Sequence, residues 1–224
     1  MHFTRKNIIA VIGLFFLLLL SGCKPKEEPL TEEQFIDLLR EPTVMITVGE
    51  SRASGVIVGK DEECITIATV AHLMSGYDQG IITFCNGKTG FGDVFYCNEA
   101  DDICLLKIAR EDMTKEFVDT LSVAKIDTAR YDSLETDDEV FLAGSQVGVA
   151  ANVLPLTFKT KDYYVPEFDS YYMYLYGDVF PGMSGSGLYD KDGYLIGLLA
   201  GGSETSEALC IPVTDVIEVW NLNK

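Results

Sequence analysis

The chain reads Pro181-Gly182-Met183-Ser184-Gly185-Ser186-Gly187-Leu188 shortly before an Asp192-Gly193 turn. Glycines close to a serine keep side chains away, so a substrate carbonyl can approach the backbone. The N–H groups of Gly182 and Ser184 are then placed to stabilise the negative oxygen that develops during acyl transfer. Glycine–serine runs also occur in ordinary turns, so this stretch alone leaves a nucleophile and a plain loop equally open.

A serine hydroxyl is a poor nucleophile at neutral pH and needs a base beside it. The chain has two histidines, and His2 falls in a segment that we expect to be removed, so His72 is the candidate base. His72 follows the β-branched run Ile65–Val70, which predicts a strand that ends near the imidazole and aims it rigidly. The alternative is a histidine that simply packs at a strand end.

A third group must orient the imidazole, and Asp102 is the candidate. It leads the apolar segment Ile103–Ile108, which predicts another buried strand. An aspartate at that place is otherwise a turn residue, one of 35 acidic side chains. The order His72, Asp102, Ser184 favours a catalytic triad over three unrelated residues.

These residues resemble those of the trypsin-like (chymotrypsin-fold) serine peptidases, and most closely the bacterial protease domain of the high-temperature-requirement (HtrA) type. The serine motif has the Ser-Gly-Ser form seen in glutamyl endopeptidases. Two flanking segments, Ala53–Val58 and Ala208–Val213, extend the likeness to about residues 43–222. The three motifs that carry the resemblance are Thr69-Val70-Ala71-His72, Asp102-Ile103-Cys104-Leu105-Leu106-Lys107 and Gly182-Met183-Ser184-Gly185-Ser186.

The resemblance implies an all-β fold of two six-stranded antiparallel β-barrels, with a C-terminal helix and a short N-terminal helix. It also implies a mechanism. Ser184 attacks the scissile carbonyl, His72 accepts its proton, and Asp102 fixes the tautomer of the imidazole. The backbone N–H groups of Gly182 and Ser184 hold the oxyanion. The expected substrates are proteins or peptides.

The same resemblance indicates residues that bind the substrate. Ala200, Gly201 and Gly202 resemble the strand that pairs with the substrate backbone, and Gly202 leaves open a specificity pocket beneath it. Asp178 lies six residues before Ser184, which matches the pocket-floor aspartate of trypsins and suggests Lys or Arg before the scissile bond. HtrA-type domains carry an aspartate eight residues before the serine and favour aliphatic residues. A two-residue deletion would reconcile the two, so both specificities stay open.

Three positions depart from the family pattern. Met183 stands where an aspartate or asparagine is usual, and methionine cannot pair with a newly cut N-terminus. We therefore expect no activation by zymogen cleavage. Ser186-Gly187 replaces a common Gly-Pro pair, and Val70 replaces a usual alanine.

The start of the chain has the pattern of a bacterial lipoprotein signal. Arg5 and Lys6 precede the apolar run Ile8–Leu20, which is too short for an ordinary transmembrane helix but fits the core of a signal peptide. The run ends in Leu20-Ser21-Gly22-Cys23, which resembles a lipobox. We expect residues 1–22 to be removed; an ordinary cleaved signal or an uncleaved anchor is the alternative.

Cleavage there would leave Cys23 as a lipidated first residue, followed by a charged linker to residue 30. Several acyl chains on Cys23 would be needed for stable anchoring, because one chain binds membranes only marginally. The predicted location is the bacterial cell envelope. The anchor would lie in an outer membrane, facing periplasm or surface, or on the outer face of the plasma membrane.

Residues 31–224 are the expected peptidase domain, with barrels at about 43–110 and 139–212. Helices are predicted at 31–40 and 213–222, and the acidic stretch 110–138 is predicted to connect the barrels. We expect no PDZ-like domain. The predicted strands of the first barrel are Thr43–Val48, Gly55–Val58, Cys64–Ala68, Ile81–Phe84, Phe91–Cys97 and Ile103–Ile108. Those of the second are Val140–Ala143, Gln146–Leu156, Tyr171–Tyr176, Gly187–Tyr189, Tyr194–Leu199 and Ala208–Ile211.

The charge and the cysteine and histidine content argue against a nucleic-acid-binding protein and against a metal site. Loss of residues 1–22 changes the formal net charge from −18 to about −20, so no nucleic-acid partner is expected. Beyond Cys23 the five remaining cysteines are an odd number, and Cys104 and Cys210 sit in apolar segments that suit small core residues. The Asn86-Gly87 turn does not bring Cys85 and Cys97 together. With one mature histidine we expect no metal, and we expect no cofactor.

Two other functions are alternatives to a serine peptidase. An α/β-hydrolase would need glycine in place of Ser186 and a histidine after Ser184, and none follows. A non-catalytic lipoprotein that uses the same fold to bind a protein or polymer at the cell surface stays open, because Met183 and Val70 depart from the usual motifs.

Overall fold

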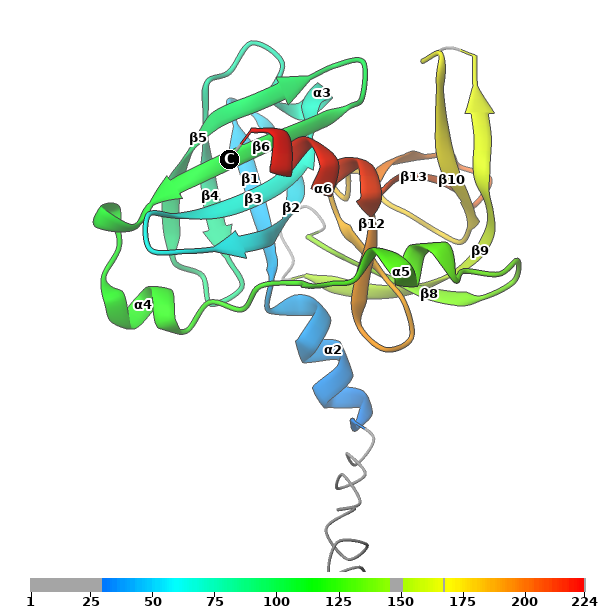
Figure 1. The fold of residues 1–224 in the computed structure, drawn as a ribbon, viewed down its shortest axis with the longest axis horizontal. Helices are drawn as coiled ribbons and strands as arrows, with labels where there is room; N and C mark the ends of the chain where they lie inside the picture. Colours follow the sequence, from blue (N-terminus) through cyan, green and yellow to red (C-terminus); the bar gives the residue numbers. More distant parts are fainter. Residues whose placement is uncertain (1–29, 146–150, 167, 224) are drawn as a thin grey trace, which may run out of the picture. The chain divides into compact units, whose positions relative to one another are not determined.

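Strands dominate the computed structural model, which describes residues 30–145, 151–166 and 168–223. The signal segment and Cys23 lie outside these residues. The strands form two closed six-stranded antiparallel barrels, one from each half of the chain (Figure 1). None of the helices in the described ranges is long and apolar enough to cross a membrane.

The first barrel closes in the order β1-β2-β3-β6-β5-β4. Its interior is filled by β-branched and leucine side chains such as Ile46, Ile57, Ile67 and Leu106, all without solvent exposure. Burial of each such side chain contributes about 1.5–3 kcal/mol. Its strands are β1 (Thr43–Val48), β2 (Ser51–Lys60), β3 (Cys64–Val70), β4 (Gln79–Phe84), β5 (Thr89–Asn98) and β6 (Ile103–Ala109).

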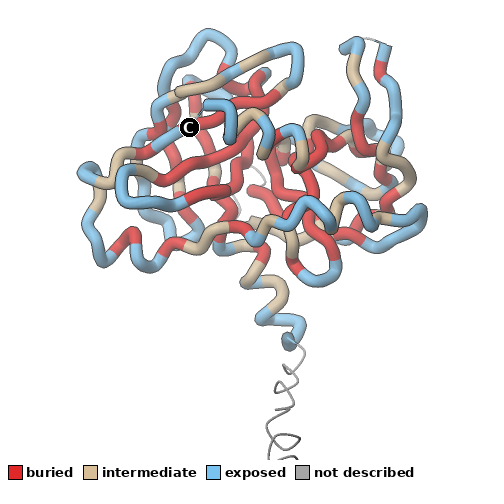
Figure 2. The backbone as a smooth tube through the Cα atoms, in the orientation of Figure 1, coloured by how far each residue is buried: buried red, intermediate tan, exposed pale blue. Residues whose placement is uncertain are grey.

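The second barrel closes because β11 pairs with both β8 and β12. The short β7 (Lys125–Ile126) adds to β12 in parallel outside the ring. The ends of β9 and β10 extend as a paired hairpin whose tip is exposed (Figures 1 and 2). Its strands are β8 (Glu139–Gly144), β9 (Asn152–Val165), β10 (Ser170–Tyr176), β11 (Gly187–Tyr189), β12 (Tyr194–Gly202) and β13 (Glu207–Pro212).

Helices lie before, between and after the barrels. The first, α2 (Glu32–Arg40), buries Leu39 and places Phe35 edge-on to Phe141 of β8, with ring centroids 5.0 Å apart. The stretch between the barrels holds a 3₁₀ turn, η1 (Arg110–Asp112), and two short helices, α4 (Lys115–Asp119) and α5 (Thr128–Asp132). The last helix, α6 (Val213–Leu222), follows the second barrel.

The last helix packs on the first barrel. A Cβ added at Gly59 of β2 would lie 2.3 Å from the indole of Trp220, so that glycine makes room for the ring. Val213 and Val216 are buried in the same core as the side chains of β1–β6. The helix thus joins the end of the second half of the chain to the first half.

The predicted architecture is confirmed, with one strand displaced. All twelve predicted barrel strands are present, and the predicted helices match α2 and α6 closely. The strand expected at Gln146–Leu156 instead begins at Asn152 and continues to Val165, and residues 146–150 lie outside the described residues. Residues 157–165 stay extended because they pair with β10, for example Tyr163 with Tyr172.

Register places two cysteines opposite each other. Cys97 of β5 and Cys104 of β6 are direct cross-strand partners, both as free thiols. Cys104 and Cys210 have no solvent exposure, which confirms that they are core residues. Cys85 lies beside the β4–β5 turn, and, as expected, the hairpin does not pair it with Cys97.

Candidate active site

His72 lies in a one-turn helix, α3 (Ala71–Met74), directly after β3. The sequence predicted a strand that ends close to His72, and β3 ends at Val70, two residues before it; the helical turn that carries His72 was not predicted. The chain turns helical because Ala71, Leu73 and Met74 suit a helix, and all three are buried. The backbone N–H of His72 would otherwise be unsatisfied at the start of this turn, and it donates to the Asp102 carboxylate at 3.0 Å.

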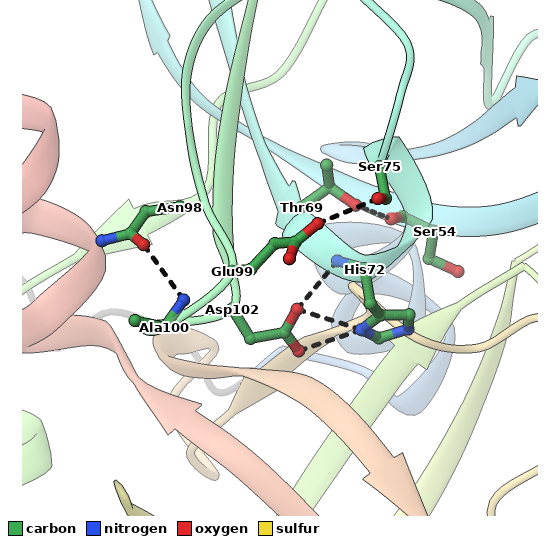
Figure 3. A network of polar contacts seen from close by, with 8 residues as sticks. All are labelled: Ser54, Thr69, His72, Ser75, Asn98, Glu99, Ala100 and Asp102. Carbon is green, nitrogen blue, oxygen red and sulfur yellow. Dashed lines mark hydrogen bonds and ion pairs between the residues drawn. The ribbon is translucent and has the colours of Figure 1, made fainter. Parts of the chain in front are cut away.

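The imidazole and the Asp102 carboxylate form a close pair (Figure 3). Nδ1 of His72 lies 3.0 Å from both carboxylate oxygens. The His72 side chain is 53% exposed and that of Asp102 is 14% exposed. The hydrogen bond to Asp102 raises the pKa of His72 above that of an ordinary histidine, although burial opposes the shift. Nε2, the other ring nitrogen, is left to face a reactant.

The turn that carries Asp102 is locked from both sides. Asp102 has φ of +51°, a left-handed conformation that aspartate tolerates better than most residues. Its carbonyl accepts from the N–H of Ala71 at 3.1 Å while its carboxylate accepts from His72. The two residues are therefore held together by backbone and side chain at once.

The Ser184 turn is held by packing and by its backbone. Met183 has no solvent exposure and lies in the core of the second barrel. Gly182 and Gly185 have φ of +90° and +80°, which favour glycine. A Cβ at Gly185 would lie 2.1 Å from the carbonyl oxygen of Ser54, so no other residue fits there.

Hydrogen bonds connect this turn to the strand that leads to His72. The N–H of Ser54, on β2, donates to the carbonyl of Ser184 at 2.8 Å. The carbonyl of Ser54 in turn accepts from Thr69 Oγ1 at 2.7 Å, three residues before His72 (Figure 3). Ser184 itself is half-buried. The candidate nucleophile and the candidate base are thus linked through two residues of the first barrel.

Ser186, a departure from the family pattern, fits because of a glycine opposite. Its side chain is buried and donates to the carbonyl of Met183 at 2.5 Å. A Cβ at Gly144 of β8 would lie 1.6 Å from Ser186 Oγ, so glycine there makes room for the hydroxyl. Ser186 therefore acts as a brace inside the turn.

The predicted substrate-binding residues divide into two groups. The space beneath Gly202 is filled, because a Cβ there would lie 2.1 Å from Cγ2 of Val179. In front of Gly201, by contrast, nothing lies within 4 Å of where a Cβ would be. Asp178 is exposed, and its carboxylate accepts from Ser206 Oγ at 2.6 Å. Its role in selecting the residue before the scissile bond stays a prediction that this geometry does not support.

A cleft of about 600 Å³ opens beside His72 and Asp102. Ala200, Gly201 and Gly202 of β12 line it, whereas Ser184 and Asp178 do not. The role of these three residues in binding a substrate stays a prediction. The sequence reasoning missed the rest of the wall. It consists of Glu99, Tyr163, Val165, Phe168, Tyr172, Tyr174, Ser203, Glu207 and Leu209. The only available signal was the density of tyrosines between residues 163 and 176.

No group of three or more His, Cys, Asp or Glu side chains in the described ranges is arranged to hold a metal ion. The site itself presents the imidazole of His72 and the carboxylate of Asp102, and the Ser184 turn is linked to the strand before His72 through Ser54 and Thr69.

Two closed barrels, an imidazole–carboxylate pair and a glycine-framed serine turn define the class of trypsin-like serine peptidases. The chain matches the family described as "Trypsin-like peptidase domain" over residues 53–198, and it belongs to that family. None of the curated proteins matches it.

Solved structures show the same fold. One is the serine endoprotease from Yersinia pestis, with a TM-score of 0.68 and 21% identity, covering 87% of this chain and 67% of that one. Another is the HtrA-type protease AlgW with a tripeptide, with a TM-score of 0.70 and 22% identity, covering 86% of this chain and 63% of that one. The chain thus spans about two thirds of the length of these proteins.

Proposed function

We propose that the protein is a serine endopeptidase that acts through Ser184, His72 and Asp102 and is held at a bacterial cell envelope by lipid on Cys23. The observation that carries the proposal is the bonded pair of His72 and Asp102, with Nδ1 3.0 Å from the carboxylate. Family membership and the connection of the Ser184 turn to β3 through Ser54 support it.

In this proposal Nδ1–H of His72 donates to Asp102, which leaves Nε2 unprotonated when the pH lies above the raised pKa of His72. Nε2 accepts the proton of Ser184 Oγ as the hydroxyl attacks the scissile carbonyl. The protonated imidazole then gives that proton to the leaving amine, and Asp102 stabilises its positive charge. Water hydrolyses the acyl-enzyme by the reverse sequence.

The oxyanion would be held by the N–H groups of Gly182 and Ser184. Burial of Met183 between these two residues supports this role, because it fixes the peptide planes on either side. A methionine anchored by packing needs no charged partner. The turn is therefore expected to be competent without cleavage of a pro-segment.

Fluorophosphonate labelling of residues 24–224 tests the proposed chemistry. We expect one label on the wild type, mapped to the peptide that contains Ser184, and none on Ser184→Ala. The neighbouring Ser186 is buried, so a label on it would contradict the assignment. No label on either protein would instead favour the protease-fold binding module.

Membrane attachment needs a separate test. Cells that express the full chain are fed an alkyne fatty acid, and the label on the wild type is compared with that on Cys23→Ala. We expect label and membrane fractionation for the wild type only. Equal fractionation of the two proteins would point to an uncleaved anchor.

A further inference from the structure

The cleft beside His72 combines negative charge with aromatic surface. Besides Asp102, which is bonded to His72, the carboxylates of Glu99 and Glu207 line it. The aromatic part of the wall consists of the rings of Tyr163, Phe168, Tyr172 and Tyr174. No lysine or arginine is among the residues of the described chain that line it. Its unbalanced charge therefore favours a positively charged occupant.

The charge on Glu207 is fixed by its neighbours. Oε1 accepts from the hydroxyl of Tyr174 at 3.0 Å, and Oε2 accepts from Ser203 at 3.0 Å and Thr205 at 2.9 Å. The hydrogen bonds from Thr205, Tyr174 and Ser203 lower the pKa of Glu207, so the group is ionised at neutral pH. A carboxylate offers about four lone-pair sites and three of them are used, so Glu207 can accept a hydrogen bond from a further donor.

Glu99 adds a second charge at the end of the cleft near His72. One of its oxygens accepts from Ser75 Oγ at 2.9 Å (Figure 3). Glu99 lies in the turn between β5 and β6, three residues before Asp102, and this position places it on the cleft wall beside His72 and Asp102. A cation in the cleft would thus lie between charges supplied by both barrels.

The aromatic rings are preassembled. Tyr163 and Tyr174 stack with centroids 4.9 Å apart, and Phe168 lies edge-on to Tyr172 at 6.0 Å. Faces of such rings attract guanidinium more than ammonium groups, because guanidinium is planar and weakly hydrated. Arginine therefore suits this wall better than lysine.

The route into the cleft points to a peptide. On the side of β12 opposite β13, the pairing with β11 in the described chain ends at Leu198, which lies opposite Gly187, the first residue of β11. The backbone of Ala200–Gly202 therefore offers an edge to which an extended peptide can add as a strand. The same strand approaches the nucleophile turn, since Gly185 N–H donates to the carbonyl of Leu199 at 2.7 Å.

The open space that could select a substrate side chain therefore lies in front of Gly201 of β12 and not beneath Gly202. Val179 fills the space beneath Gly202, whereas the space in front of Gly201 is open to the cleft. We propose that the cleft binds an arginine side chain of a peptide substrate, within about four residues of the scissile bond, and that this contact selects the substrate. This rests on the proposed peptidase function for the cleavage, while the binding step is independent of it.

The first experiment measures cleavage. Internally quenched peptides of neutral sequence carry one arginine at each position from four before to four after the scissile bond. Each has a twin with citrulline, which keeps the shape and removes the charge. We expect kcat/KM to be at least about tenfold higher for arginine at one position. That ratio should fall to about threefold or less in Glu207→Gln.

The matched control is Glu204→Gln. Glu204 is exposed in the loop between β12 and β13, three residues before Glu207, and it does not line the cleft, so this variant should keep the arginine preference. A wild-type protein that labels with fluorophosphonate but shows no preference at any position would overturn the proposal. So would a preference that survives Glu207→Gln.

The second experiment measures binding without chemistry. Fluorescence anisotropy compares the arginine and citrulline peptides on Ser184→Ala. We expect tighter binding of the arginine peptide, weakened at least about fivefold by Glu207→Gln. Equal affinity for the two peptides would overturn the proposal. If fluorophosphonate labelling fails while this difference persists, the peptidase function is wrong and the arginine site stands.

Discussion

The two barrels hold their halves of the site in different ways. In the first barrel, hydrogen bonds and charge bring His72 to Asp102, and the imidazole stays half in solvent. In the second barrel, packing of Met183 and close approach at Gly185 hold Ser184. Changes in charge or pH at the His72–Asp102 pair should therefore alter activity and leave the fold intact. Changes in side-chain size at the Ser184 turn should alter activity and also destabilise the fold.

The largest effect is expected from Gly185→Ala. The new Cβ would lie 2.1 Å from the Ser54 carbonyl, in backbone with φ of +80°, so we expect loss of fluorophosphonate labelling together with a lowered Tm. Gly87 has the same φ and nothing within 4 Å, so Gly87→Ala should cost about 1–2 kcal/mol of strain and keep the label. Normal labelling of Gly185→Ala would contradict a turn held by shape.

The second largest effect is expected from Asp102→Asn, which should lower kcat and leave the stability of the fold unchanged. The amide oxygen can still accept from the His72 backbone N–H, so Tm should stay close to that of the wild type. The imidazole loses the partner that fixes its tautomer, and kcat should fall about 10⁴-fold. Initial-rate assays on a peptide substrate measure kcat, and a thermal melt measures Tm, so the two together distinguish a catalytic effect from a loss of stability. A large fall in Tm would mean that Asp102 acts mainly in the fold.

Met183→Asp, compared with Met183→Leu, tests the core of the second barrel. A carboxylate at a position with no exposure should lower the free energy of unfolding by about 3 kcal/mol or more. Leucine should cost less than about 1.5 kcal/mol and retain labelling. Urea unfolding measures both. An aspartate variant as stable as the leucine variant would indicate that a charged partner is available at the turn.

The smallest effect is expected from pH. The proposed mechanism requires neutral His72, and the hydrogen bond to Asp102 raises the pKa of His72. Activity should therefore fall on the acid side of a midpoint above about 6.5, approaching tenfold per pH unit. In Asp102→Asn the midpoint should move toward the acid. A rate that stays flat from pH 8 to 5 would count against His72 as base.

Much of the fold was readable from local pattern. The run Cys64–Ala68 is rich in β-branched residues, so its strand was predicted from its first residue and fell two residues short of the observed end at Val70. The short helices at Lys115–Asp119 and Thr128–Asp132 were missed because five residues are too few to show helical periodicity. Thr157–Val165 was missed because its charged residues favour no strand until β10 pairs with it.

Site residues with distinctive chemistry could be predicted from the sequence. The contacts of residues that were assigned only by counting positions along the chain could not. His72 and Asp102 lie together as the motifs indicated. Counting residues back from Ser184 suggests a pocket-floor role for Asp178, which stays a prediction; in the structure its carboxylate accepts a hydrogen bond from Ser206 Oγ, which the count could not reveal. The pairing of Cys97 with Cys104 depends on an irregularity between Val94 and Tyr96, which no local pattern reveals.

The helix α6 has a consequence for the order of events during synthesis. It follows the second barrel in sequence but places Trp220 against Gly59 of the first. The outer surface of the earlier half is thus completed only by residues made after the later half. A nascent chain that has finished its first barrel still lacks this clamp, so the molecule matures as a whole and not in two successive pieces.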